Sequence, residues 1–331
     1  MEVVSMPLWA WILFYVLVLV MLVIDLKSFG KKGQHEVSVS EALKMTAVWI
    51  GVSLVFCAGI YLWYPVAPHE KAMEFLAGYL IEKSLSMDNL FVFLMLFSFF
   101  GIQRKYQHEV LFWGIFGALV LRSIFIFAGA AMVQRFEWIL GIFGVFLIYT
   151  GIKMFNHQED ENVDPSKNIF VKTFKRFFPV SDQMDGDKFF TERIVATDAQ
   201  APDPVNIPPR KRYLATPLFI ALIVIETTDV AFAVDSIPAV FSVSRDPFII
   251  LTSNIFAILG LRALYFALAA VAKYFTYLKY GLGVILSFVG VKMLLDVFGI
   301  CEVPTWMSLV IIFSLLVLSM LLSVVISRRK G

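Results

Sequence analysis

Residues 144–154 read GVFLIYTGIKM and residues 283–293 read GVILSFVGVKM, so six of eleven positions are identical. Two other pairs of segments match at similar separations: residues 115–122 with 255–262, and residues 84–88 with 231–235. Self-similarity of this kind indicates a structural unit that occurs more than once in a chain. We therefore predict that the chain holds one unit twice.

The copies lie in a strongly apolar chain. Its 331 residues are 59% hydrophobic and only 16% charged, and the mean hydropathy is +0.79. This composition excludes an ordinary water-soluble protein. Nine apolar stretches approach the length of about 20 residues that crosses a bilayer as a helix. They are approximately 7–26, 45–64, 74–100, 109–132, 138–155, 214–241, 248–271, 280–298 and 305–327. The predicted fold class is all-α, a polytopic membrane protein with about nine transmembrane helices.

The repeat assigns three of these helices to each copy. Segments 74–100, 109–132 and 138–155 correspond to 214–241, 248–271 and 280–298. Because three is an odd number, the second copy enters the membrane from the opposite side. Inverted repeats of this kind build many secondary transporters, which bind their substrate near the bilayer midplane.

Five parts follow along the chain. Residues 1–72 form two N-terminal transmembrane helices, 73–156 the first repeat, 157–213 a charged loop, 214–298 the second repeat, and 299–331 a last helix with a basic tail. Within the loop, Phe170, Phe174, Phe177 and Phe178 recur at helical spacing between basic residues. This pattern predicts a basic amphipathic helix that lies on the inner leaflet.

The distribution of Lys and Arg predicts the orientation. Twenty of them fall in the segments on one side of the predicted helices and three on the other. The richer side is expected to be cytoplasmic, which places the N-terminus outside and the tail inside. The net charge of +2 gives no overall field that would hold nucleic acid. No nucleophile with a partner base is recognisable, so we do not expect an enzyme.

Charged residues inside the predicted spans need a reason, since each costs at least about 2.5–3.5 kcal/mol at the bilayer centre. Segment 74–100 carries Glu82, Lys83, Asp88 and Asn89, and segment 214–241 carries Glu226, Asp229 and Asp235. The repeat pairs Glu82 with Asp229 and Asp88 with Asp235. Each copy therefore has two acids six positions apart.

Six positions turn a helix by about 240°, so both acids of a copy cannot share one face of a regular helix. Pro238 follows Asp235 closely and removes a backbone donor. We therefore expect a kink or an unwound turn beside Asp235, which would bring the carboxylates toward one point.

Arg122 and Arg262 occupy equivalent positions of the second helix in each copy. The five carboxylates less Lys83 and the two arginines leave a formal charge of −2, which one divalent cation would neutralise. A buried carboxylate can instead take up a proton, so metal and protons could exchange. Static ion pairs that hold the bundle together are the alternative. For the arginines we favour a charge-balancing role over contact with the substrate.

The donors that converge are oxygens, which suit hard cations such as Mn²⁺, Mg²⁺ or Ca²⁺. None of the four histidines lies within a predicted span. The two cysteines, Cys57 and Cys301, are far apart in the sequence, which disfavours zinc, copper and thiol chemistry.

EKSLSMDN at 82–89 and DVAFAVDSIPA at 229–239, with segments 78–100, 120–129, 215–243 and 246–266 around them, resemble the TerC family of bacterial integral membrane proteins, particularly its Alx branch. The resemblance runs over essentially the whole chain. It implies a LysE-type transporter fold, an inner-membrane location and manganese export, with a historical link to tellurium resistance and a redox-modulator label for Alx. The family's acidic motif positions fall on Glu82, Asp88, Asn89, Glu226, Asp229 and Asp235.

We thus expect a secondary transporter that exports Mn²⁺ in exchange for protons, with no permanently bound cofactor and with a homo-oligomer left open. The alternative is an assembly, metallation or redox-modulating partner that does not transport. Such a protein should present partner surfaces outside, where the predicted loops are short.

Overall fold

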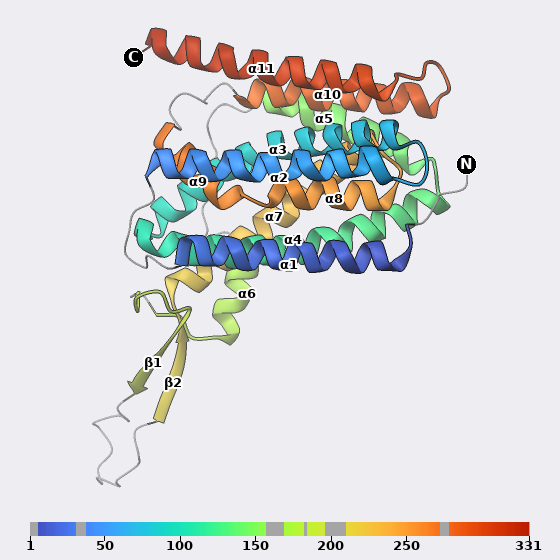
Figure 1. Cartoon of the computed structure of the whole chain (residues 1–331). Helices are drawn as coiled ribbons and strands as arrows, with labels where there is room; N and C mark the ends of the chain where they lie inside the picture. Colours follow the sequence, from blue (N-terminus) through green and yellow to red (C-terminus); the bar gives the residue numbers. More distant parts are fainter. Residues whose placement is uncertain are drawn as a thin grey trace, which may run out of the picture.

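The computed structural model describes residues 6–30, 38–156, 169–181, 184–195, 210–271 and 278–330. In chain order the elements are α1 (Leu8–Gly30), α2 (Val39–Trp63), α3 (Pro68–Phe99), α4 (Arg104–Arg135), α5 (Ile139–Asn156), α6 (Ile169–Phe177), β1 (Phe190–Val195), β2 (Arg210–Ala215), α7 (Pro217–Phe241), α8 (Pro247–Ile258), α9 (Leu261–Val271), α10 (Leu278–Val297) and α11 (Thr305–Lys330). The long helices run side by side, with α1 and α11 on opposite faces of the bundle (Figure 1). The prediction of an all-α polytopic membrane protein is confirmed.

Six described helices are long and apolar enough to cross a membrane: α1, α2, α4, α7, α10 and α11. The bent pair α8–α9 makes a seventh if it counts as one span. Two of the predicted spans fall outside this set for different reasons. Helix α3 carries several charged side chains, and the apolar part of α5 is short (Ile139–Phe155). The number of nine spans therefore stays a prediction.

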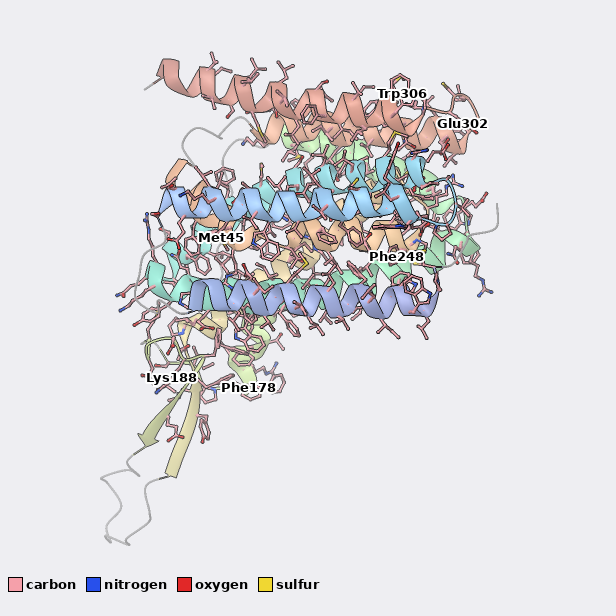
Figure 2. The ribbon with its side chains drawn as sticks, in the orientation of Figure 1. Met45, Phe178, Lys188, Phe248, Glu302 and Trp306 are labelled. Atoms are coloured by element: carbon pink, nitrogen blue, oxygen red, sulfur yellow. The ribbon has the colours of Figure 1, made fainter. Side chains whose placement is uncertain are left out.

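Aromatic side chains join α1 and α2 to α8 in the interior. The Phe14 ring lies 6.0 Å from both Phe56 and Phe248, and Phe56 lies 4.5 Å from Phe256, all measured between ring centroids. Figure 2 shows Phe248 between α1 and α2. Outward-facing apolar residues such as Val55 are largely exposed, as expected of a surface that faces lipid. The two N-terminal helices thus pack directly against α8.

The broken span is not the one that the sequence predicted. Helix α7 is continuous from Pro217 to Phe241, so there is no unwound turn beside Asp235. Pro238 lies in the last turn, and the helix ends three residues later. The break occurs between α8 and α9, which meet at 40°. There Gly260 has a φ of +81°, and a Cβ at this position would lie 2.6 Å from the Trp49 ring of α2. Only glycine fits both the backbone conformation and the space.

Helices α5 and α10 are in backbone contact at two pairs of glycines. A Cβ on Gly144 would lie 3.0 Å from the carbonyl oxygen of Gly290, and one on Gly151 would lie 2.6 Å from that of Gly283. The sequence repeat aligns Gly144 with Gly283 and Gly151 with Gly290. The contacts therefore run crosswise between equivalent positions. A two-fold relation between two copies produces this crosswise pattern.

The loop of residues 157–213 contains the predicted amphipathic helix, now α6, and a two-stranded antiparallel sheet that was not predicted. In that sheet Phe190 pairs with Ala215 and Val195 with Arg210. Helix α6 and the two strands project from one side of the bundle (Figure 1), where Figure 2 labels Phe178 and Lys188. The short strands escaped prediction because charged residues interrupt their apolar pattern.

Candidate functional site

Arg122 lies at the centre of the bundle and joins two acids. Its Nη1 donates to Glu82 on α3. Its Nε and Nη2 donate to the two carboxylate oxygens of Asp229 on α7, at 3.1 and 2.8 Å. Arg122 and Glu82 are fully buried, and Asp229 is 7% exposed. Charges this deeply buried must be paired, because desolvation costs each of them several kcal/mol.

An amide from the broken span completes this group. Asn254 of α8 donates through Nδ2 to Glu82 Oε2 at 2.9 Å. Its own Oδ1 is buried without a hydrogen-bond partner among the described residues. We call Arg122, Glu82, Asp229 and Asn254 the Arg122 cluster. Asn254 was not predicted from the sequence, although it is the sole amide in segment 248–271.

Glu226 lies one turn before Asp229 on α7 and points at α4. A methyl group on Gly117 of α4 would overlap the Glu226 carboxylate. The Oε2 atom of this carboxylate is buried and has no hydrogen-bond partner in the described part of the chain. Three carboxylates and one guanidinium thus gather where α3, α4 and α7 meet, with a formal charge of −2. Gly117 was not identified from the sequence.

Asp235 does not join this group. Asp235 is half-buried and accepts a hydrogen bond from Thr150 of α5 at 3.5 Å. Asn89 is buried, and the side chain of Asp88 lies outside the described residues. Within the described ranges, no three Asp, Glu, His or Cys side chains are placed to hold a metal ion. The structure therefore does not gather all five predicted carboxylates at one point.

Lys83 and Arg262 have partners away from the Arg122 cluster. Lys83 is buried and donates to the carbonyl oxygen of Ala257 at 3.1 Å, in the last turn of α8. The break leaves carbonyls of that turn without helical partners, and a cation stabilises such a helix end. Arg262, just after the break, donates to Asp25 of α1 at 2.8 Å. The two arginines that the predicted repeat pairs therefore differ in their partners. Arg122 binds acids of α3 and α7, whereas Arg262 binds an acid of α1.

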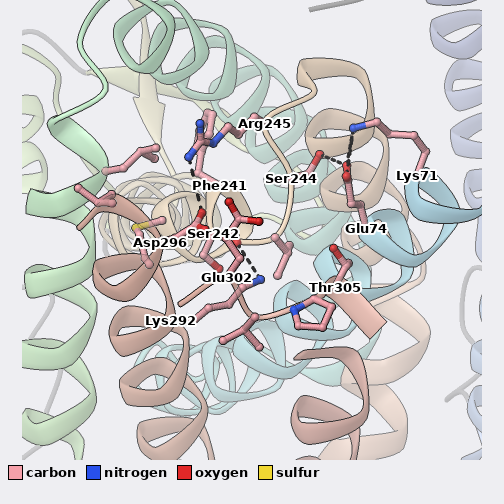
Figure 3. A pocket seen from close by; sticks show the side chains of 16 residues that line it. Lys71, Glu74, Phe241, Ser242, Ser244, Arg245, Lys292, Asp296, Glu302 and Thr305 are labelled. Atoms are coloured by element: carbon pink, nitrogen blue, oxygen red, sulfur yellow. Dashed lines mark hydrogen bonds and ion pairs between the residues drawn. The ribbon is translucent and has the colours of Figure 1, made fainter. Parts of the chain in front are cut away.

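A cavity of about 440 Å³ lies at the predicted outer end of the bundle. On one side Lys71 pairs with Glu74 at 2.8 Å, and on the other Arg245 lies 3.6 Å from Asp296 (Figure 3). Lys292 donates to a backbone carbonyl at the end of α7. The three acidic and three basic side chains that line the cavity cancel in formal charge. Unlike the Arg122 cluster, this cavity has no net charge that would favour a cation.

Comparison with known proteins agrees with this architecture. An Escherichia coli K12 protein named "Putative membrane-bound redox modulator Alx" is 44% identical over 337 residues, covering 99% of this chain and 98% of its own length. A Photorhabdus laumondii protein of the same name is 43% identical, over 97% of this chain and 96% of its own. The "Uncharacterized membrane protein STKORF319" of Myxococcus xanthus is 45% identical, over 96% and 93%.

No solved structure matches the chain. The family described as "Integral membrane protein TerC family" matches residues 67–331, which include α3 and every element of the Arg122 cluster. The family match covers the chain from the start of α3 onward, and the relatives also cover α1 and α2. The chain therefore belongs to the TerC family of integral membrane proteins.

Proposed function

We propose that the chain is a secondary transporter that exports a divalent metal ion, Mn²⁺ first among them, in exchange for protons. The observation that carries this proposal is the Arg122 cluster, in which Glu82 and Asp229 are buried at the meeting point of both repeats. A purely structural pair would need one acid for one base. Here Arg122 binds two acids and Glu226 adds a third close by. An acid excess inside a membrane protein is typical of an ion pathway.

The donor set favours a hard cation. Glu82, Asp229 and Glu226 offer carboxylate oxygens, and Asn254 offers an amide oxygen without a partner among the described residues. Oxygen donors of this kind suit Mn²⁺, Mg²⁺ and Ca²⁺. The formal charge of −2 matches one such ion. Manganese and the outward direction are taken from the resemblance to the family.

We propose that binding of the ion changes the contacts of Arg122. Its guanidinium donates to three carboxylate oxygens of Glu82 and Asp229. A divalent cation that binds both acids would compete with Arg122 for these oxygens, and Arg122 would give up at least one of its contacts. Protons that bind the acids after the metal leaves would restore the charge balance. One divalent ion or two protons would each neutralise the charge of −2 that Arg122 leaves on the three acids.

The repeat supports an alternating mechanism. Crosswise contacts of Gly144 with Gly290 and of Gly151 with Gly283 are those expected of two units related by a two-fold axis in the membrane plane. The Arg122 cluster combines residues of both units. We propose that the substrate site lies at their interface.

A redox role, as in the relatives' names, is the competing proposal. Thiol chemistry has little support, because the chain holds two cysteines. Cys57 is half-buried in α2 and donates to the carbonyl of Ala72, whereas Cys301 is exposed after α10. A role as an assembly or metallation partner stays a further alternative. Both predict that the purified chain moves no metal by itself.

The decisive experiment is transport by the purified full chain in sealed vesicles that contain a Mn²⁺-sensitive dye. We expect Mn²⁺ entry with the parent and a strongly reduced rate with Glu226→Gln, which keeps the shape of the side chain. Glu137→Gln, at an exposed position of the α4–α5 loop, is the matched control and should transport like the parent. No Mn²⁺ movement by the parent in either direction would refute the transporter proposal.

A further inference from the structure

Helix α6 has an inner apolar side that packs on the bundle. Val171 is 2% exposed, and the Phe174 ring lies 5.2 Å from Phe219 of α7. Phe174 also stacks on Phe178, with the ring centroids 4.8 Å apart. The contact of Phe174 with Phe219 holds α6 against the first turn of α7. The position of α6 relative to the bundle is therefore fixed by packing.

A second apolar surface of α6 is largely exposed. Ile169, Phe170 and Phe177 are 70%, 60% and 72% exposed. Phe170 and Phe177 are seven positions apart, which places them on the same side of a helix. Phe178, directly after the helix, is 55% exposed. We call Ile169, Phe170, Phe177 and Phe178 the α6 apolar patch.

The remaining side of α6 is basic. Lys172, Lys175 and Arg176 are exposed, and the helix contains no acidic residue. At about 100° per residue, these three side chains lie on one third of the helix circumference. The inner apolar side and the α6 apolar patch occupy the rest. An exposed apolar surface beside a cluster of cations complements a bilayer surface with anionic headgroups.

The direction and the depth of α6 fit the same partner. Figure 1 shows α6 running across the direction of the bundle helices, hence along the plane of the membrane. Phe219, which it contacts, is the third residue of α7, at the end that the distribution of Lys and Arg predicts to be cytoplasmic. The helix therefore lies at the level where the bundle leaves the hydrocarbon.

We propose that α6 is an interfacial anchor, with the α6 apolar patch inserted at the headgroup boundary of the cytoplasmic leaflet and its cations bound to anionic lipid headgroups. This inference is independent of what the chain transports. The anchor would attach the loop of residues 157–213 to the membrane surface beside the start of α7. Loss of the lipid contact should leave the bundle and the packing of α6 on α7 intact.

The test uses the full chain with Cys57→Ser and Cys301→Ser, reconstituted in vesicles of phosphatidylcholine with or without phosphatidylglycerol. A spin label on Phe177→Cys is compared with one on Lys175→Cys, which lies on the opposite side of the same helix. We expect the Phe177 label to be reached by oxygen from the lipid far better than by a water-soluble nickel chelate, and the Lys175 label to show the reverse. The Phe177 label should lie deeper when phosphatidylglycerol is present.

Replacing Lys172, Lys175 and Arg176 together by Gln should remove the dependence on phosphatidylglycerol at the Phe177 label. Three results would overturn the proposal. One is access of the nickel chelate to Phe177 in both kinds of vesicle. Another is protection from both reagents, which would mean a protein partner. The third is dipolar broadening between labelled copies, which would mean that a second copy of the chain covers the patch.

Discussion

Replacing Arg122 by Met tests whether its guanidinium holds the centre of the bundle together. Methionine is an uncharged side chain of similar length, so the substitution leaves Glu82 and Asp229 buried without their cation. Removing one partner of a buried ion pair costs about 3–5 kcal/mol. That is on the order of a hundred-fold to several thousand-fold in the unfolding equilibrium, since 1.4 kcal/mol is a factor of ten. We expect this loss in a reversible unfolding titration of the purified chain in mixed detergent micelles.

Two further variants separate the cost of unpaired charge from that of lost packing. Arg245→Met removes a pair whose side chains are 55% and 38% exposed, so it should cost only about 0–1 kcal/mol. Adding Glu82→Gln and Asp229→Asn to Arg122→Met removes the unpaired charges and should recover most of the lost stability. If Arg122→Met unfolds like the parent, the guanidinium does not stabilise the bundle. If the triple variant is no more stable than the single one, lost packing rather than unpaired charge is responsible.

Further predictions concern transport and the broken span. Asp88→Asn and Asp235→Asn should fold normally but let cellular manganese rise under a manganese load, measured by elemental analysis; normal export by both variants would remove these acids from the pathway. Gly117→Ala should displace the neighbouring glutamate carboxylate and slow Mn²⁺ entry into vesicles at a stability change of at most about 1 kcal/mol. Gly51→Ala, where no atom lies within 4 Å, is its control, and equal rates in the two would contradict the role of that carboxylate. Gly260→Ala should lower the free energy of unfolding by at least about 1–2 kcal/mol, because of its positive φ and the adjoining indole ring; an unchanged titration would argue against a strained break.

All nine apolar stretches predicted from the sequence lie on helices, because the helical signal is local. Six of these helices, or seven with the bent pair, are long and apolar enough to cross a membrane. A run of apolar residues is helical in a bilayer whatever surrounds it. The pair of Glu82 and Asp229 was also within reach, since the internal repeat aligns their two positions. Their meeting through Arg122 was not predicted as a direct contact. Asp25, the partner of Arg262, was missed because 237 positions separate the two residues and the repeat does not include α1.

The position of the helix break depends on contacts between helices that are distant in the sequence. Pro238 was the strongest breaker by residue type, yet α7 continues past it to Phe241 and ends there. The break at Gly260 depends on Trp49 from another helix. A glycine inside an apolar run was its sole signal in the sequence. Tertiary packing, rather than residue preference, selects the site of the break.

The glycine contacts between α5 and α10 restrict how the molecule can move. One helix belongs to each repeat, and their backbones touch at Gly144–Gly290 and at Gly151–Gly283 with no room for side chains. Rocking the two repeats against each other as rigid halves would separate these backbones and lose their close packing. We therefore expect α5 and α10 to stay together as the static part of the protein. The moving parts would be α3, α4, α7 and α8. Each predicted repeat would then contribute one helix to the static part and two helices to the moving part.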